Sequence, residues 1–199
     1  MTQHNTTQQA IIRLIEYVVC GVKNIKLCNI SKINTGEFVR KDKQTENGKY
    51  PVYNGGISNT GFYDEYNTME NKIIISARGA NAGYTNKINV KFWAGNSCYV
   101  IDIFEKNINQ NYIYYYLKKN EISLMDLQQQ GSIPAVSKTQ IENLEIPIPP
   151  LHIQEKIVSI LDSFSAASSG LIPLLEREIE LGEKRYSYYR DKLLNFKEK

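Results

Sequence analysis

A run of prolines near residue 150 divides this chain into parts of different character. The segment Ile146-Pro147-Ile148-Pro149-Pro150 cannot lie inside a helix, because proline lacks a backbone N–H and its ring clashes with the preceding turn. We therefore expect it to be extended and stiff, and we place a domain boundary there. The chain then consists of an N-terminal segment, a mixed globule and a helical region, at 1–22, 23–150 and 151–199.

The globule is expected to be an α+β fold with short helices and a curled, mostly antiparallel sheet. Short β-type runs alternate with glycine and asparagine turns, which is typical of hairpins. The expected strands are 50–53, 61–63, 72–76, 91–94 and 97–103. One helix is expected at 111–119, and another from Ser137, where Ser137-Lys138-Thr139-Gln140 has the capping-box pattern. In the N-terminal segment, Ile11, Leu14, Ile15 and Val18 would share one face of a brief helix.

After the prolines, the apolar residues follow a helical period. A first helix has Ile153, Ile157 and Ile160 on one face, and SAASSG at 165–170 is expected to interrupt it. In a second helix, apolar residues recur in alternating steps of three and four, the pattern of a coiled-coil seam broken only by Gly182. The seam residues are Ile172, Leu175, Ile179, Tyr186, Tyr189, Leu193 and Phe196. Pro173 is compatible with this helix in its first turn.

This seam needs a surface to cover it. Burying each of its large side chains is worth about 1.5–3 kcal/mol, so we do not expect all of them to stay in water. A coiled coil with another chain or a second copy would cover them, and so would folding back onto the chain's own globule.

Positive charge is concentrated in the globule. Residues 151–199 carry equal numbers of basic and acidic side chains, so the net charge of +3 comes from residues 1–150. A local excess of basic residues at 23–50 is the electrostatic footprint of a polyanion binder, although ordinary surfaces show it too. The candidate phosphate contacts are Lys32, Arg40, Lys41, Lys43, Lys49, Lys91 and Lys138.

Side chains that can read DNA bases lie on the expected turns. Arginine can bond guanine and asparagine can bond adenine through paired hydrogen bonds in the major groove. The candidate base readers are Arg78, Asn81, Tyr53, Asn54 and Asn59. Most of these asparagines and tyrosines also suit turns and a core, whereas Arg78 leaves an apolar strand at its end and should project into solvent.

Catalytic, metal and membrane signatures are missing from the sequence. The three cysteines form no CxxC pair and the two histidines are far apart, which argues against a zinc site or a disulfide framework. The glycine-rich runs lack the features of phosphate and dinucleotide loops, and Cys98 suits a core strand. No run approaches 18 consecutive apolar residues and no secretion signal is visible, so we expect no membrane span and a cytoplasmic location.

Three runs of the globule stand out together: Pro51–Asn67 (PVYNGGISNTGFYDEYN), Ile73–Tyr84 (IIISARGANAGY) and Phe92–Ile101 (FWAGNSCYVI). They resemble a target-recognition domain of the specificity subunit of type I restriction–modification systems. Gly131–Phe164 is similar to the family's bridge to its conserved helix, and Glu176–Phe196 to its C-terminal helical region.

The resemblance implies a non-catalytic subunit that reads double-stranded DNA. Family members usually carry two recognition domains, each reading half of a split sequence, joined by two long antiparallel helices that set the spacer. The helices dock methyltransferase (modification) subunits, and restriction subunits join that core. Neither a cofactor nor a metal is expected here, because S-adenosylmethionine, ATP and magnesium would belong to the partner subunits.

This chain departs from the family pattern in having one recognition domain and only a brief N-terminal helix. A half-subunit that pairs with a second copy through the seam would restore a two-domain reader of a palindromic site. A truncated product or a separately expressed fragment would fit equally. Two rival classes are a protein-interaction scaffold that oligomerises through its coiled coil, and an autonomous enzyme such as a nuclease.

Overall fold

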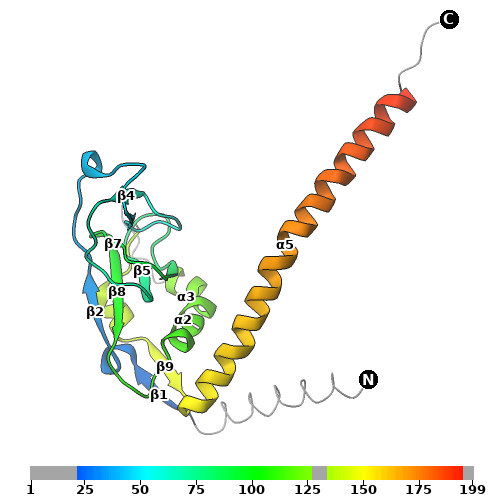
Figure 1. Cartoon of the computed structure of the whole chain (residues 1–199). Coiled ribbons are helices and arrows are strands. Elements are labelled where there is room, and N and C mark those ends of the chain that lie inside the picture. The colour runs from blue at the N-terminus through cyan, green and yellow to red at the C-terminus, as the bar shows by residue number, and fades with distance from the viewer. Residues whose placement is uncertain (1–21, 127–133, 195–199) are drawn as a thin grey trace, which may run out of the picture. The chain divides into compact units, whose positions relative to one another are not determined.

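The computed structural model describes residues 22–126 and 134–194, and it divides the chain into two compact units between Glu155 and Lys156. The globular unit contains every strand and helix up to the first turn of helix α5 (Figure 1). The brief N-terminal helix expected around Ile11–Val18 lies outside the described residues.

Strands of the described residues form three sheets. The largest is antiparallel throughout and has the order β2 (Ser31–Thr35), β8 (Cys98–Ile103), β5 (Lys72–Ser76) and β6 (Thr85–Ile88). The second has the order β4 (Gly61–Tyr63), β3 (Tyr50–Tyr53) and β7 (Trp93–Ala94), with β3 and β7 parallel. In the third, β1 (Lys23–Lys26) pairs antiparallel with β9 (Glu145–Ile148). The expected α+β class with mostly antiparallel pairing is confirmed.

One cluster of core residues lies where the two larger sheets meet. Ile74 of β5 and Val100 of β8 pack with Ile88, Phe92 and Cys98, and the ring of Tyr53 packs against this cluster. Burial raises the pKa of the Cys98 thiol to about 11, so it is neutral at physiological pH. Cys98 is therefore a core residue, as its strand context predicts.

Three short helices follow β8 in the chain. Helix α2 (Gln110–Lys119) is capped by Asn109, whose side chain accepts hydrogen bonds from the backbone N–H groups of Asn111 and Tyr112. Helix α3 spans Glu121–Asp126. Helix α4 (Lys138–Glu142) has the predicted capping box: the Gln140 N–H donates to the Ser137 hydroxyl, and the Ser137 N–H donates to the Gln140 side chain. The 3-10 turns η1 and η2 span Leu27–Asn29 and Lys41–Lys43.

Local sequence signals place several elements closely. The strands expected at 50–53, 61–63 and 72–76 coincide with β3, β4 and β5. The helix expected at 111–119 begins one residue earlier, and the strand expected at 91–94 is shortened to β7. The proline-rich segment is extended, as predicted, but part of it also forms β9, with Pro147 in register with Asn24.

The first turn of α5 is held in the globular unit by Gln154, which is 0% exposed. Its side-chain oxygen accepts the Asn109 N–H at 2.8 Å. Its amide nitrogen donates to the carbonyl oxygens of Pro149 at 2.8 Å and Asn107 at 3.1 Å. One buried side chain thus joins the start of α5 to the loop that precedes α2.

The expected interruption at 165–170 is wrong, because α5 runs unbroken over Leu151–Leu194. Serine and alanine tolerate a helix, and serine hydroxyls can bond the carbonyl four residues back. Ser163 and Ser169 do so, donating to Ser159 and Ser165 at 2.7 and 2.8 Å. Pro173 consequently lies inside the helix rather than in a first turn. It has no N–H to donate, so it gives the carbonyl of Ser169 no helical hydrogen bond.

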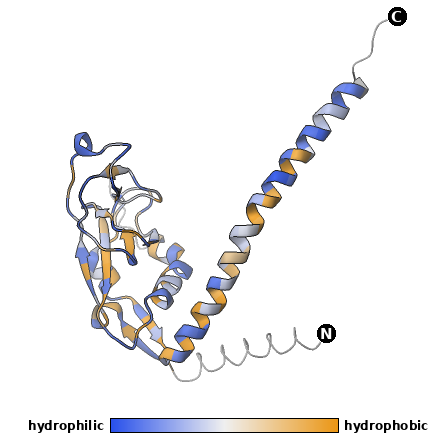
Figure 2. Ribbon diagram, viewed as in Figure 1, coloured by the Kyte–Doolittle hydropathy of each residue, from blue (hydrophilic) through white to orange (hydrophobic). Residues whose placement is uncertain are grey.

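The seam side chains of α5 that the structure describes are exposed. Ile172, Leu175, Ile179, Tyr186 and Tyr189 have between 53% and 69% of their surface accessible. Apolar and polar residues alternate along this helix (Figure 2). The side chains of Leu193 and Phe196 lie outside the described set.

Helix α5 also meets a length-and-composition test for a membrane span. The test is met over Leu151–Lys192, with a mean hydropathy of 1.4 across an 18-residue window. The length of uninterrupted apolar runs in the sequence predicts no span. A mean hydropathy gives a different result because serine and glycine end an apolar run but lower the mean only slightly. Length and composition alone are weak grounds for a span.

Candidate nucleic-acid interface

Three loops meet at one end of the two larger sheets, and we call residues 54–60, 77–84 and 95–97 the loop cluster. Asn54 accepts the backbone N–H of Ser97 at 3.2 Å. A Cβ placed on Gly55 would lie 3.1 Å from Ser97 and 3.2 Å from the carbonyl oxygen of Arg78. Gly55 has φ +82°, which glycine adopts without strain. The glycine thus allows the loops that carry Asn54 and Arg78 to approach closely.

Arg78 is exposed, as its position at the end of β5 predicts. Its backbone bridges to Ala135, and the neighbouring Gly79 N–H donates to the carbonyl oxygen of Pro134 at 2.9 Å. Asn81 is half-buried in the same loop, where its carbonyl oxygen accepts the Tyr84 N–H at 2.9 Å. The backbone around Arg78 is therefore well held while the guanidinium faces solvent.

The other candidate base readers have contacts inside the protein. The ring of Tyr53 packs edge-on against Phe92 with centroids 5.7 Å apart, and burial raises the pKa of its hydroxyl. The amide of Asn59 donates to the carbonyl oxygen of Gly61 at 3.2 Å. Together with the bond from Ser97 to Asn54, these contacts give Tyr53, Asn54 and Asn59 structural roles. Their part in base reading stays a prediction.

The basic segment 40–49 lies beside the loop cluster. The Thr45 N–H donates to the carbonyl oxygen of Phe62 at 2.8 Å, and the Thr60 hydroxyl donates to the Gln44 side chain at 3.1 Å. The side chains of Lys41, Lys43 and Lys49 are exposed. Arg40 forms an ion pair with Asp42 at 3.0 Å, which offsets part of its charge.

The remaining predicted cations are dispersed. Lys138 is close in sequence to Val136, whose N–H donates to the carbonyl oxygen of Ala77 at the edge of the loop cluster. Lys138 pairs with Glu142 at 3.5 Å, and Lys91 lies over the Tyr66 ring at 4.8 Å. Lys32 is in register with Asp102, four residues along β8 from the cluster end at Cys98. That places it roughly 13 Å away, so the structure does not bring Lys32 to the loop cluster.

Two residues with roles here were not among the candidates. Ile57 is exposed in the middle of the first loop, and Asn86 donates to its carbonyl oxygen at 3.3 Å. The available signal for Ile57 was one large apolar residue inside the turn-forming run Gly55–Gly61. Asn86 gave no separable signal, because asparagine is frequent throughout this part of the sequence.

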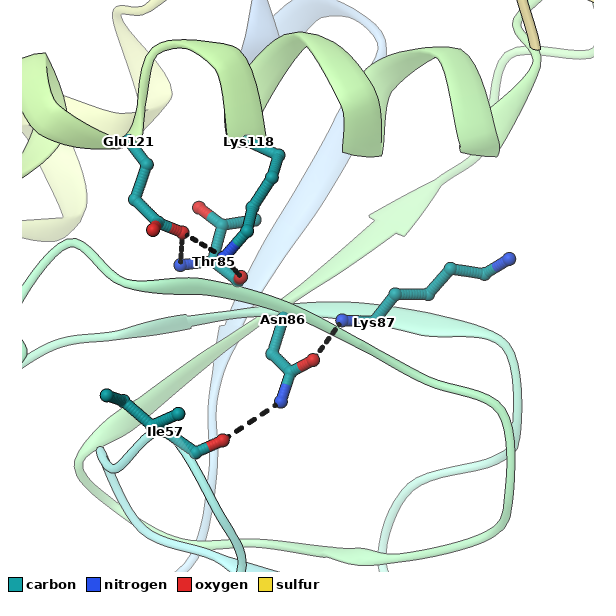
Figure 3. A network of polar contacts seen from close by, with 6 residues as sticks. All are labelled: Ile57, Thr85, Asn86, Lys87, Lys118 and Glu121. Carbon is teal, nitrogen blue, oxygen red and sulfur yellow. Dashed lines mark hydrogen bonds and ion pairs between the residues drawn. The ribbon is translucent and has the colours of Figure 1, made fainter. Parts of the chain in front are cut away.

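A polar network anchors the strand that leaves the loop cluster (Figure 3). Thr85, the first residue of β6, is bonded at both backbone groups. Its N–H donates to Glu121 at 2.9 Å, and its carbonyl oxygen accepts from Lys118 at 3.1 Å. Lys118 and Glu121 pair at 2.6 Å, and the ammonium lies 3.9 Å from the Tyr84 ring centroid. Helices α2 and α3 thereby hold the end of the loop that carries Arg78.

Glu121→Gln is expected to lower the free energy of unfolding by about 1–3 kcal/mol, because Lys118 and the Thr85 N–H both lose a charged acceptor. Urea unfolding followed by circular dichroism measures this. Lys119→Gln on the exposed side of α2 is the control and should change stability by less than about 0.5 kcal/mol. An equal effect of the two substitutions would contradict the anchoring role.

The charge state of Lys118 sets the upper pH limit of this contribution. Burial opposes the ammonium, but the hydrogen bond and charge of Glu121, together with Tyr84, outweigh burial, so the pKa is raised above 10.5. Because the folded-state pKa is the higher one, the stabilisation is present below about pH 10.5 and is lost as the pH rises through the folded-state value.

Among residues 22–126 and 134–194, no group of three or more His, Cys, Asp or Glu side chains is placed to hold a metal ion. The loop cluster itself offers hydrogen-bonding side chains and the positive charge of Arg78.

A sequence profile described as "Type I restriction modification DNA specificity domain" matches residues 21–181. The chain belongs to this family. The family resemblance drawn from the sequence is thereby confirmed.

Curated members of the specificity family are similar along most of this chain. A putative type I specificity subunit from Mycoplasma pneumoniae is 28% identical over 193 residues, covering 94% of this chain and 62% of the relative. A putative type I restriction enzyme specificity subunit from Haemophilus influenzae is 33% identical over 175 residues, covering 83% of this chain and 44% of the relative. The chain thus spans roughly half of the length of these two relatives.

Solved structures of specificity subunits share the fold. The crystal structure of the S subunit from M. genitalium aligns with a TM-score of 0.70 at 24% identity, covering 88% of this chain and 47% of that one. The HsdS subunit from Thermoanaerobacter tengcongensis aligns with a TM-score of 0.60 at 19% identity, covering 84% and 46%. The aligned parts of these structures match the antiparallel sheets and the long helix of this chain.

Proposed function

We propose that this chain is a DNA-recognition subunit of a type I restriction–modification complex, and that its globular unit reads one half of a bipartite site. One observation carries this proposal: the loop bearing Arg78 meets the loop bearing Asn54 and Asn59, with the basic segment 40–49 alongside. Hydrogen-bonding side chains flanked by exposed lysines suit major-groove reading combined with phosphate contacts.

Helix α5 pairs with a second copy through its seam in this proposal. Its exposed apolar side chains support a protein partner, because association would remove them from water. A two-fold symmetric dimer would hold two globular units, which suits a palindromic split site. A helix of 44 residues is about 66 Å long, so it can act as the spacer between half-sites.

A second apolar stripe on α5 suits a different partner. Leu174, Leu181 and Tyr188 are exposed and recur every seven residues, one position before the seam positions 175, 182 and 189. We assign this stripe to a methyltransferase subunit, with the restriction subunit joining that core. The chain itself is a non-catalytic cytoplasmic protein here, and S-adenosylmethionine, ATP and magnesium are handled by its partners. In this proposal, the two protein interfaces cover the exposed apolar side chains of α5, so no membrane is needed to cover them.

Arg78→Ala is expected to weaken binding of the full chain to its preferred duplex by about 1–3 kcal/mol, with a much smaller effect on scrambled DNA. The reason is that a paired arginine–guanine contact exists only on the preferred sequence. Fluorescence anisotropy with both duplexes measures the difference. Equal losses on the two duplexes would make Arg78 a phosphate contact instead.

Lys41→Ala is the matched comparison from the basic segment 40–49. It should weaken binding to every duplex alike and flatten the dependence of log K on log salt. The wild-type slope also tests the rival scaffold function, because a protein that contacts DNA phosphates must lose affinity steeply with salt. A wild-type chain without measurable duplex binding at low salt would refute the DNA-reading role.

A further inference from the structure

Ile57 stands out in the loop cluster by its chemistry. Its side chain is 56% exposed, and among the described residues of the cluster it is the large hydrophobic one that remains exposed. The rest of its loop consists of asparagine, glycine, serine and threonine. Removing an apolar side chain from water is favourable, so a ligand that covers this isoleucine would gain binding free energy.

The backbone of Ile57 is held in place, so its exposure is not that of a loose loop. Asn86 donates to the Ile57 carbonyl oxygen at 3.3 Å (Figure 3). Where the loop leaves the sheet, the Gly55 N–H contacts the Cys98 sulfur at 3.1 Å; where it returns, the Thr60 N–H donates to the carbonyl oxygen of Val52 at 2.8 Å. The isoleucine is therefore fixed at three points along its loop.

Asn86 acts as a positioning residue rather than a base reader. Its amide nitrogen is bonded to Ile57, and its amide oxygen accepts the Lys87 N–H at 2.9 Å. The preceding residue, Thr85, is fixed by Lys118 and Glu121. Helices α2 and α3 thus fix Thr85, and the next residue, Asn86, holds the middle of the first loop, so the exposed side chain of Ile57 is presented within the loop cluster that also carries Arg78.

We propose that Ile57 is a specificity-determining residue that packs against the C5-methyl group of a thymine in the major groove. That methyl group is the apolar feature the four base pairs display there, and side chains without hydrogen-bonding groups recognise it. Arg78 and Asn81 would read hydrogen-bonding edges, whereas Ile57 would read shape and apolarity. This inference rests on the proposed function and assigns one base of the half-site to one side chain.

The test removes the methyl group from DNA without altering base pairing. The full chain first selects duplexes from a randomised pool. Each thymine of the selected sequence is then replaced in turn by uracil, and affinities are measured by anisotropy. One replacement is expected to weaken wild-type binding about fourfold, the value of one buried methyl-sized group. Ile57→Ala should bind the thymine and uracil duplexes equally, and Ile57→Val should keep part of the preference.

Ile122→Ala is the matched control, since Ile122 on α3 is 76% exposed and lies outside the loop cluster. This variant should keep the full penalty for uracil. If the wild-type chain tolerates uracil at every position, or if Ile57→Ala keeps the penalty, the role of Ile57 is refuted and DNA recognition stands. If no sequence is enriched from the pool, the proposed function itself fails.

Discussion

Replacing Leu175 and Ile179 together by aspartate is expected to turn a dimer of this chain into a monomer. Both side chains are exposed on the seam of α5, and in a symmetric pair each substitution acts twice. Losing four buried side chains at about 1.5 kcal/mol or more each amounts to at least about 6 kcal/mol. That corresponds to roughly four orders of magnitude in the dimer dissociation constant. Light scattering at micromolar concentration should report twice the chain mass for the wild type and the chain mass for the variant.

Leu174→Asp provides the control on the same helix. Leu174 is a leucine of similar exposure on the second apolar stripe, so this substitution should leave the dimer intact while weakening association with a methyltransferase subunit. A wild-type chain that is monomeric at these concentrations would contradict the half-subunit model. If the double variant Leu175→Asp, Ile179→Asp keeps the dimer mass, as Leu174→Asp should, then pairing does not use the seam.

Gln154→Leu is expected to destabilise the globular unit by about 3 kcal/mol or more. The substitution keeps the side chain's bulk but leaves the Asn109 N–H and the Pro149 carbonyl oxygen without their partner. Buried polar groups that lose a hydrogen bond cost about 1–3 kcal/mol each. The midpoint of urea unfolding should fall accordingly, and the loss should appear in the transition of the globular unit.

Two substitutions on the same turn separate hydrogen bonding from helix effects. Glu155→Gln changes an exposed neighbour and should alter stability by less than about 0.5 kcal/mol. Gln154→Glu keeps an acceptor for Asn109 but, when ionised, has no donor for Pro149. The free energy of unfolding of the Gln154→Glu variant should therefore rise as the pH is lowered, because the protonated carboxyl group can again donate a hydrogen bond. An unchanged unfolding midpoint for Gln154→Leu would show that this clamp contributes little.

Signals contained within a few residues could be read from the sequence. The capping box at Ser137 needs four residues, and strands β3, β4 and β5 lie between turn residues that mark their ends. Strand β6 (Thr85–Ile88) carries polar residues without alternation, so nothing separated it from a loop. Strands β1 and β9 pair across about 120 residues of chain, and local patterns carry no information on such partners.

The candidate site shows the same limit. Arg78 could be placed because an apolar strand runs directly into it. The sequence cannot tell whether an asparagine amide faces solvent or serves its own fold, as those of Asn54, Asn59 and Asn86 do. Gln154 offered one overlooked signal: it shares a helix face with Ile157 and Leu161, where a polar side chain calls for buried partners.

The pairing of β1 with β9 has a consequence for how such chains change. Lys23 and Ile148 are partners in register, so the two ends of the segment 23–148 lie side by side (Figure 1). A module joined to its surroundings at a single place can be exchanged as a cassette, because the flanking segments meet the same two adjacent attachment points whichever module is inserted. Recombination between genes at these two positions would exchange the segment from Lys23 to Ile148 as one piece and leave α5 unchanged.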